Sequence, residues 1–156
     1  FAEVAFDGSL VFEDLADARH AIDDLRQAPP DDLDSALRLE ITRFTKATGI
    51  PTEYHSQPTP PLTENLKETV LRFVAEALTN ITKYARAQLV TVDLEIKEHK
   101  LLVSIQDDGQ GFDAASIPAG HYGLLGIKER VRLANGKFEI DSRVGTGTTL
   151  RIELPL

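Results

Sequence analysis

The middle of the chain, from Phe73 to Ala85, has the apolar spacing of an amphipathic helix. At about 100° per residue, one stripe of this helix is apolar, which predicts that it packs against a core. A second stripe carries Glu76, Asn80 and Lys83 at positions i, i+4 and i+7. In most proteins a polar stripe of this kind is only the solvated side of a helix. Its meaning here therefore depends on the rest of the chain.

Before this central helix, the pattern predicts two further helices and one strand. The first helix covers Phe12–Gln27 and ends before Pro29-Pro30, because a proline ring interrupts helical hydrogen bonding. Asp31 and Asp32 are candidate N-caps for a second helix, which runs from about Leu33 to Thr48. A short strand is predicted around Thr52–Ser56.

Beyond the central helix the apolar spacing changes from helical to alternating, which is typical of strands. A hairpin is predicted over 90–105, with His99 and Lys100 at its turn. A helix follows over about Leu125–Ala134, and two more strands close the chain. Each strand has one apolar face, so the predicted fold class is α/β: a two-layer α/β sandwich in which helices cover one face of a mixed sheet.

Composition limits the function classes that need to be considered. The 156 residues suit one domain, and a net charge of −8 argues against a nucleic-acid-binding surface. The absence of cysteine excludes disulfides, thiolate metal sites and cysteine nucleophiles. No apolar run approaches the roughly 20 residues that span a bilayer, which predicts a cytoplasmic chain without membrane contact. The chain begins at Phe1 and lacks methionine, so we expect it to be a piece of a longer protein, whose own membrane attachment is left open.

Three glycine-containing segments follow the hairpin. Asp107 ends the second hairpin strand and is followed by Gly109 and Gly111, which allow close backbone approach to a ligand. A carboxylate only accepts hydrogen bonds, so it suits an exocyclic amine such as that of adenine. The segment 120–126 is also glycine-rich and opens a helix, where free N–H groups favour phosphate. By itself, the third segment, 145–148, predicts only a hairpin turn.

Together these segments resemble the catalytic ATP-binding domain of sensor histidine kinases, in the branch that includes nitrate and cell-envelope stress sensors. EALTNITKYA is similar to the N box of this family, DDGQGFD to its first glycine box, GLLGIKERV to its second, and GTGTTLRIELP to its closing glycine motif. The resemblance covers about residues 31–156. It implies the Bergerat ATP-binding fold, which the family shares with gyrase, mismatch-repair ATPases and the ninety-kilodalton heat-shock chaperone.

The resemblance implies ATP and magnesium as ligands, with roles on the central helix. Asn80 would hold Mg²⁺ and Glu76 would orient a magnesium-bound water or assist as a base, and these two residues would be the catalytic ones. Lys83 would meet phosphate oxygens, and Tyr84 would pack near the nucleotide. Tyr84 stands where the branch usually has histidine, and Lys128 where it usually has arginine.

The glycine boxes would supply the rest of the nucleotide site. Asp107 would accept the adenine amino group, and residues 112–122 would form a mobile ATP lid. The other positions implied to contact nucleotide or its water network are Gly109 and Gly111 beside the ring, Gly123, Leu124 and Gly126 beside the phosphates, and Thr148 on the adenine side.

The implied activity is that of an ATP-dependent protein-histidine kinase. The γ-phosphoryl group would pass to a histidine outside this chain and then to an aspartate on the receiver domain of a response regulator. Residues 1–30 would be the second helix of a dimerising phosphoacceptor hairpin and a linker, and 31–156 the catalytic domain, in a parent homodimer. No histidine here has the acid after it that the acceptor carries, so packing or solvated roles are expected for His20, His55, His99 and His121.

Two other classes remain open. An anti-sigma-factor kinase has the same ATP fold and phosphorylates serine on a partner, although the helix predicted over Phe12–Gln27 argues against it. In a non-catalytic nucleotide-gated interaction module, ATP would only control association. Phosphotransfer to a response regulator through a complementing histidine helix would separate the three.

Overall fold

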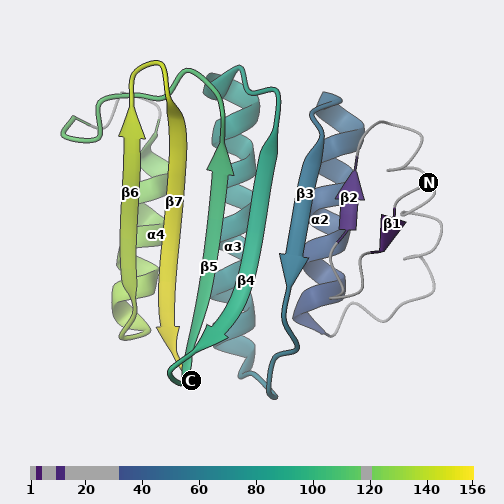
Figure 1. Cartoon of the computed structure of the whole chain (residues 1–156). Coiled ribbons are helices and arrows are strands. Elements are labelled where there is room, and N and C mark those ends of the chain that lie inside the picture. Colours follow the sequence, from purple (N-terminus) through teal and green to yellow (C-terminus); the bar gives the residue numbers. More distant parts are fainter. Residues whose placement is uncertain (1–2, 5–9, 13–31, 117–120) are drawn as a thin grey trace.

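The computed structural model describes residues 3–4, 10–12, 32–116 and 121–156. Its strands form one sheet in the order β1-β2-β3-β4-β5-β7-β6, with α2, α3 and α4 behind it (Figure 1). Only β3 and β4 pair in parallel, so among the described strands the sheet is mixed, and the predicted two-layer sandwich is confirmed. The elements are β1 Glu3–Val4, β2 Leu10–Phe12, α2 Leu33–Thr48, β3 Thr52–Ser56, α3 Glu64–Asn80, the π-helical turn η1 Ile81–Ala85, β4 Val90–Lys97, β5 Lys100–Asp107, α4 Tyr122–Leu133, β6 Lys137–Arg143 and β7 Gly147–Pro155.

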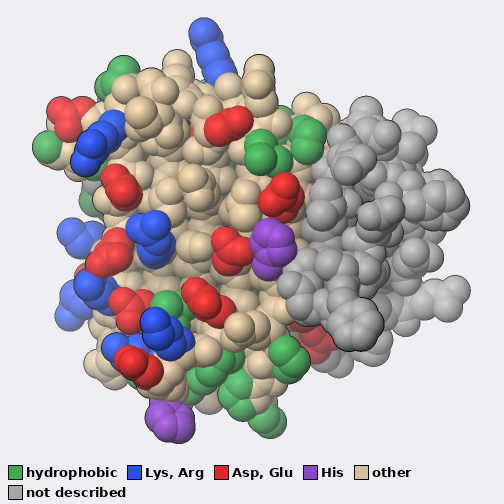
Figure 2. Space-filling view, in the orientation of Figure 1, with side chains coloured by type: hydrophobic (Ala, Val, Ile, Leu, Met, Phe, Trp, Pro, Cys, Tyr) green, Lys and Arg blue, Asp and Glu red, His purple; other side chains and the backbone are tan. Residues whose placement is uncertain are grey.

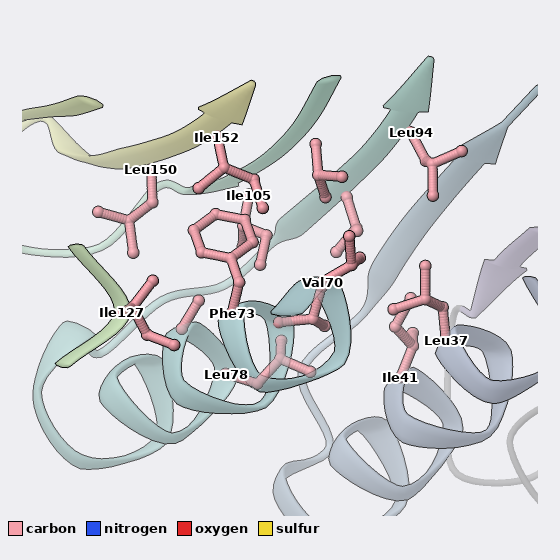
Figure 3. Close-up of a cluster of buried hydrophobic side chains, with 14 of the residues drawn as sticks. Leu37, Ile41, Val70, Phe73, Leu78, Leu94, Ile105, Ile127, Leu150 and Ile152 are labelled. Carbon is pink, nitrogen blue, oxygen red and sulfur yellow. The ribbon is translucent and has the colours of Figure 1, made fainter. Parts of the chain in front are cut away.

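The core lies between the helices and one face of the sheet (Figure 3). Alternate residues of the strands point into it, as the two-residue spacing predicts. Phe73 of α3 is at its centre, 1% exposed, with its ring edge-on to Phe138 of β6 at 6.3 Å. Burying one such side chain stabilises the fold by about 1.5–3 kcal/mol. The buried strand residues include Val90, Val92, Leu94, Leu101, Val103, Ile105, Leu150, Ile152 and Leu154.

The opposite face of the sheet is polar. Figure 2 shows acidic and basic side chains interspersed over it. Lys137 and Glu139 form an ion pair there at 2.6 Å, and Lys100 lies 3.5 Å from Glu153. Exposed pairs of this kind contribute little stability. They explain the polar half of the alternation along these strands, because this face meets solvent and the other meets helices.

Local side-chain bonds set where the two long helices begin. The carboxylate of Asp32 accepts a hydrogen bond from the Ser35 amide at 3.0 Å, so Asp32 is the N-cap of α2. Thr63 caps α3 by accepting from the amide of Leu66 at 3.2 Å. At the other end of α2, Gly49 adopts the left-handed conformation with φ 73°. The predicted bounds of α2 are therefore confirmed.

The helix that carries the polar stripe does not continue as a regular α-helix. α3 ends at Asn80, and residues 81–85 form a π turn before Arg86, whose φ is 52°. A π turn closes i→i+5 bonds, so it takes more residues per turn than an α-helix. Side chains after Asn80 are consequently rotated less far around the helix axis than α-helical spacing predicts. The spacing of apolar residues in the sequence does not predict this π turn.

Three boundaries differ from the sequence-based expectations. Both residues of the hairpin turn, Glu98 and His99, have positive φ, and Lys100 already belongs to β5. Helix α4 begins at Tyr122 and not at Leu125, so residues 122–126 of the glycine-rich segment belong to the helix. Strands β1 and β2 were not predicted from the sequence. The first predicted helix was expected to begin at Phe12, which is wrong, because Phe12 is the last residue of β2. Residues 13–27 lie outside the described part, so the rest of that helix and the domain boundary near residue 30 stay predictions.

Candidate functional site

A cavity of about 200 Å³ lies where the end of α3, the last residue of β5 and the start of α4 meet. Apolar side chains such as Ile105 and Leu150 form much of its wall. Its polar side chains include a carboxylate, an amide, a hydroxyl and an imidazole. Of the predicted site residues, six line this cavity: Asn80, Tyr84, Asp107, Gly111, Leu124 and Thr148. A mostly apolar pocket with a few convergent polar groups is the usual form of a small-molecule site.

Asp107 is a buried carboxylate at one end of the cavity. It is 5% exposed, and its Oδ1 accepts a hydrogen bond from the Gly109 amide at 2.8 Å. Burial raises the pKa of the Asp107 carboxyl, and the nearby charge of Asp108 also raises it, whereas the bond from Gly109 opposes the shift. A buried ionised group is unfavourable without full pairing. Its remaining lone pairs suit a donor on a ligand.

The loop after Asp107 touches two other segments through its backbone. A Cβ at Gly109 would lie 2.2 Å from the Ala85 carbonyl oxygen, and a Cβ at Gly111 would lie 2.1 Å from that of Arg143. The amide of Gln110 donates to Ala85 at 2.7 Å, and the Gln110 side chain donates to the Tyr84 carbonyl. The two glycines therefore serve close packing of backbone against backbone around the cavity, and not only chain flexibility.

Asn80 and Glu76 lie near the start of α4. Asn80 is 9% exposed, and its Nδ2 has no hydrogen-bond partner among the described residues. Gly123 allows α4 to approach the Glu76 carboxylate, because a Cβ there would lie 1.8 Å from Glu76 Oε1. Glu76 does not line the cavity itself. An amide and a carboxylate offer the oxygen ligands that Mg²⁺ prefers, so these side chains fit that ion.

The π turn separates the two other residues predicted on this helix. Tyr84 lines the cavity, whereas Lys83 is exposed and does not contribute to the lining. In an α-helix the residues three and four positions after Asn80 would both lie near its face. The π turn takes more residues per turn, so Lys83, three positions on, lies further from that face, whereas Tyr84, four positions on, stays close to it. Gly126 also lies outside the lining, and a Cβ there would meet no atom within 4 Å. The roles implied for Lys83 and Gly126 stay predictions.

Two residues at the site were not assigned a ligand role from the sequence. Ser142 is 6% exposed; its hydroxyl accepts from the Phe112 amide at 2.9 Å and lies 2.7 Å from Thr148 Oγ1. The burial of Ser142 could have been predicted, since it follows Phe138 and Ile140 at two-residue steps on the inward face of β6. His121, the second residue, stacks on Tyr84 at 4.2 Å. Nothing in its sequence spacing marks it.

The histidines have different surroundings. His55 Nδ1 lies 2.8 Å from Asp93 Oδ1 on the open face of the sheet, and His99 lies in the hairpin turn. His121 is 5% exposed, and burial lowers the pKa of its imidazole, while Glu76 partly opposes this shift. His20 lies outside the described residues. These contacts agree with the packing or solvated roles expected for His55 and His99.

The described residues form neither a metal-binding cluster nor a membrane-spanning helix. No group of three or more His, Asp or Glu side chains there is arranged to hold a metal ion by itself. None of the helices there has the length and apolar character needed to cross a bilayer.

A family model and individual relatives with known names indicate the same protein family. Residues 65–156 match the family described as histidine kinase-, DNA gyrase B-, and HSP90-like ATPase. The oxygen sensor histidine kinase NreB of Staphylococcus carnosus is 38% identical over 146 residues, which are 91% of this chain and 42% of that protein. The signal transduction histidine-protein kinase/phosphatase DegS of Brevibacillus brevis is 35% identical over 150 residues, or 94% and 39%. The chain thus spans about two fifths of the length of these relatives.

Solved structures show the same fold at lower identity. The histidine kinase domain of a blue-light activated kinase from Erythrobacter litoralis matches with a TM-score of 0.67 and 19% identity, covering 89% of this chain and 70% of that one. The mycobacterial sensor histidine kinase MprB matches with a TM-score of 0.65 and 22% identity, covering 80% and 94%.

The contact between Gly123 and Glu76 predicts a coupling between these positions. Gly126→Ala should stabilise the chain by about 0.5–1 kcal/mol, because alanine favours a helix and the site is open. Gly123→Ala should gain less, because Glu76 must leave its position. In a Glu76→Ala background the two gains should become equal, and urea unfolding of the four combinations measures this. Equal gains already in the unaltered background would contradict the contact.

The buried carboxylate predicts a stability that depends on pH. Because the folded pKa of Asp107 is raised, its favourable contribution is complete below the unfolded pKa of about 3.9 and is lost as pH rises through the folded pKa. Asp107→Asn keeps an acceptor for Gly109 without a charge. Its melting temperature should exceed that of the unaltered chain at about pH 7.5, and the difference should shrink towards about pH 4.

Thermal unfolding followed by circular dichroism at several pH values tests this expectation. Asp113→Asn is the matched control, since Asp113 is an exposed carboxylate that, among the described residues, accepts only from a neighbouring amide, that of Ala115, at 3.0 Å. A lower melting temperature for Asp107→Asn at neutral pH would show that the buried charge is fully compensated.

Proposed function

Because the chain belongs to the histidine kinase-, DNA gyrase B- and HSP90-like ATPase family, we propose that it is the ATP-binding catalytic domain of a sensor histidine kinase. It transfers the γ-phosphoryl group of Mg-ATP to a histidine outside this chain, from which the group passes to an aspartate of a response regulator. The observation that carries this proposal is the buried Asp107 carboxylate, which shares one cavity with the Asn80 amide.

The Asp107 end of the cavity suits adenine. A carboxylate accepts a hydrogen bond from the exocyclic amine of adenine and repels the carbonyl that guanine has at the same place. Ile105 and Leu150 offer apolar contact to the faces of a ring. Thr148, whose hydroxyl is already oriented by Ser142 at 2.7 Å, supports a water network beside the base. These features favour ATP over GTP.

The other end of the cavity suits phosphate. The first turn of an α-helix leaves N–H groups without α-helical partners, and the positive end of the helix dipole lies there. In α4 the amide of Leu124 donates to the His121 carbonyl at 3.2 Å, which leaves those of Tyr122 and Gly123 for a ligand. Asn80 would hold a magnesium ion, with Glu76 beside it to orient a bound water. When bound, the ion would neutralise charge on the phosphates. The protein itself would contribute positioning, since phosphoryl transfer needs little covalent chemistry from the enzyme.

The partners of this function follow from the same proposal. The acceptor histidine would belong to a helical hairpin that also dimerises the parent protein, and residues 1–30 would include part of it. The receiver domain of a response regulator would take the phosphoryl group from that histidine. An anti-sigma-factor serine kinase and a non-catalytic nucleotide-gated module would have the same cavity, so a chemical test has to separate them.

A phosphotransfer assay makes this separation. The chain alone, given labelled ATP and magnesium, should bind nucleotide without gaining acid-labile phosphohistidine. Adding a hairpin protein with an intact acceptor histidine from the same parent should give label on the hairpin and then on its response regulator. Acid-stable phosphoserine on a partner would favour the anti-sigma-factor class, and ATP binding without any transfer would favour the gated module. Stoichiometric phosphate on a histidine of this chain, found by mass spectrometry, would refute an external acceptor.

A metal ligand at Asn80 predicts a specific loss of affinity. Asn80→Ala removes the amide, so magnesium-dependent ATP affinity should fall by about 10- to 100-fold, as expected when a charged group loses a partner. Titration with a fluorescent ATP analogue, with and without magnesium, measures the change. Thr79→Ala is the control on the preceding residue, which is exposed and whose hydroxyl donates to the Ala75 carbonyl of its own helix. An unchanged titration for Asn80→Ala would reject the assignment.

A further inference from the structure

His121 lines the cavity, and one nitrogen of its imidazole has no hydrogen-bond partner among the described residues. It directly precedes α4, lines the cavity and is 5% exposed. Its Nδ1 is buried and has no partner among the described residues. The only other buried side-chain atom in this condition there is Asn80 Nδ2, and Asn80 lines the same cavity. Buried polar atoms normally have hydrogen-bond partners. Both of these atoms without one belong to residues that line this cavity.

Packing alone does not explain a histidine at this position. The ring stacks on Tyr84 at 4.2 Å and 26°, and it lies 5.2 Å from the ring of Phe112 at 58°. Phenylalanine would make the same aromatic contacts without a buried nitrogen that lacks a partner. An unpaired polar atom in a buried site is unfavourable until something bonds to it. The unpaired imidazole nitrogen therefore suggests that a hydrogen-bond partner enters the cavity from outside the chain.

The surroundings of His121 suit an anionic partner. The ring lies at the N-terminal end of the 12-residue helix α4, where the positive end of the helix dipole attracts negative charge. Glu76 is the acidic side chain that acts on His121, although it does not line the cavity. The carboxylate that does line it is that of Asp107. Asp107 marks the base end of the site, so the end near His121 and Asn80 is left for phosphate.

We propose that His121 is a nucleotide-binding residue, in which an imidazole N–H donates a hydrogen bond to a phosphate oxygen of the bound nucleotide. This inference rests on the proposed ATP-binding function and adds a side chain to it. The stack on Tyr84 holds the ring in place, so that the donor is already oriented when the nucleotide enters.

Binding of a series of ligands to two variants tests the proposal. His121→Phe keeps the aromatic stack and removes both nitrogens. ADP and ATP should bind about 10- to 100-fold more weakly to it, whereas adenosine should bind as it does to the unaltered chain, because only the phosphate contact is lost. His55→Phe is the matched control, since His55 lies on the open face of the sheet and bonds to Asp93. It should leave all three affinities unchanged.

The outcomes separate this inference from the function on which it rests. Unchanged ADP and ATP affinity in His121→Phe, or an equal loss for adenosine, would overturn the role of His121 and leave the proposed function intact. An unaltered chain that binds no ATP would overturn both. If His121→Phe does not fold, nitrogen NMR of the unaltered chain decides: ADP should shift a ring nitrogen of His121 and adenosine should not, and the reverse would refute the phosphate contact.

Discussion

Backbone meets backbone directly around the cavity, and the rest of the site depends on this contact. A Cβ at Gly109 or at Gly147 would lie within about 2.2 Å of a carbonyl oxygen, that of Ala85 or of Asp107 respectively. No other residue type fits at such distances. The approach joins the end of η1, the end of β5 and the start of β7, so the carboxylate of Asp107 is held beside the helix that carries Asn80. Any widening here would separate the two ends of the proposed nucleotide site.

Most of the fold could be predicted because its signals are local. The second helix has a capping aspartate at one end and a glycine at the other, and both are found where the sequence indicated. The alternation in β4, β5 and β7 fixed which face is buried, since a shift by one residue would reverse it. The family prediction is likewise confirmed. What the sequence missed in the fold, the pairing of β2 with β3, depends on contacts between distant segments.

The site could be predicted less completely, for a physical reason. Glycines and the aspartate at the strand end are visible as a motif, whereas the π turn after Asn80 changes which side chains share a face. Lys83 and Tyr84 were both expected at the site, yet of the two only Tyr84 lines the cavity. His121 and Ser142 depend on tertiary packing, in which a histidine stacks on an aromatic ring from another element and a serine joins two strands and a loop. Neither arrangement produces a regular spacing of residues that could be recognised in the sequence.

The π turn also bears on how this chain is compared with its relatives. A π turn contains more residues than the α-helical turn that it replaces. A relative that closes the same segment as a regular α-helix would therefore need one residue fewer to bring the chain to the position of Arg86. An alignment of two such sequences without a gap would match Lys83 and Tyr84 to positions one place away from their structural equivalents. Residue correspondences beyond Asn80 are thus better taken from superposed backbones than from aligned letters.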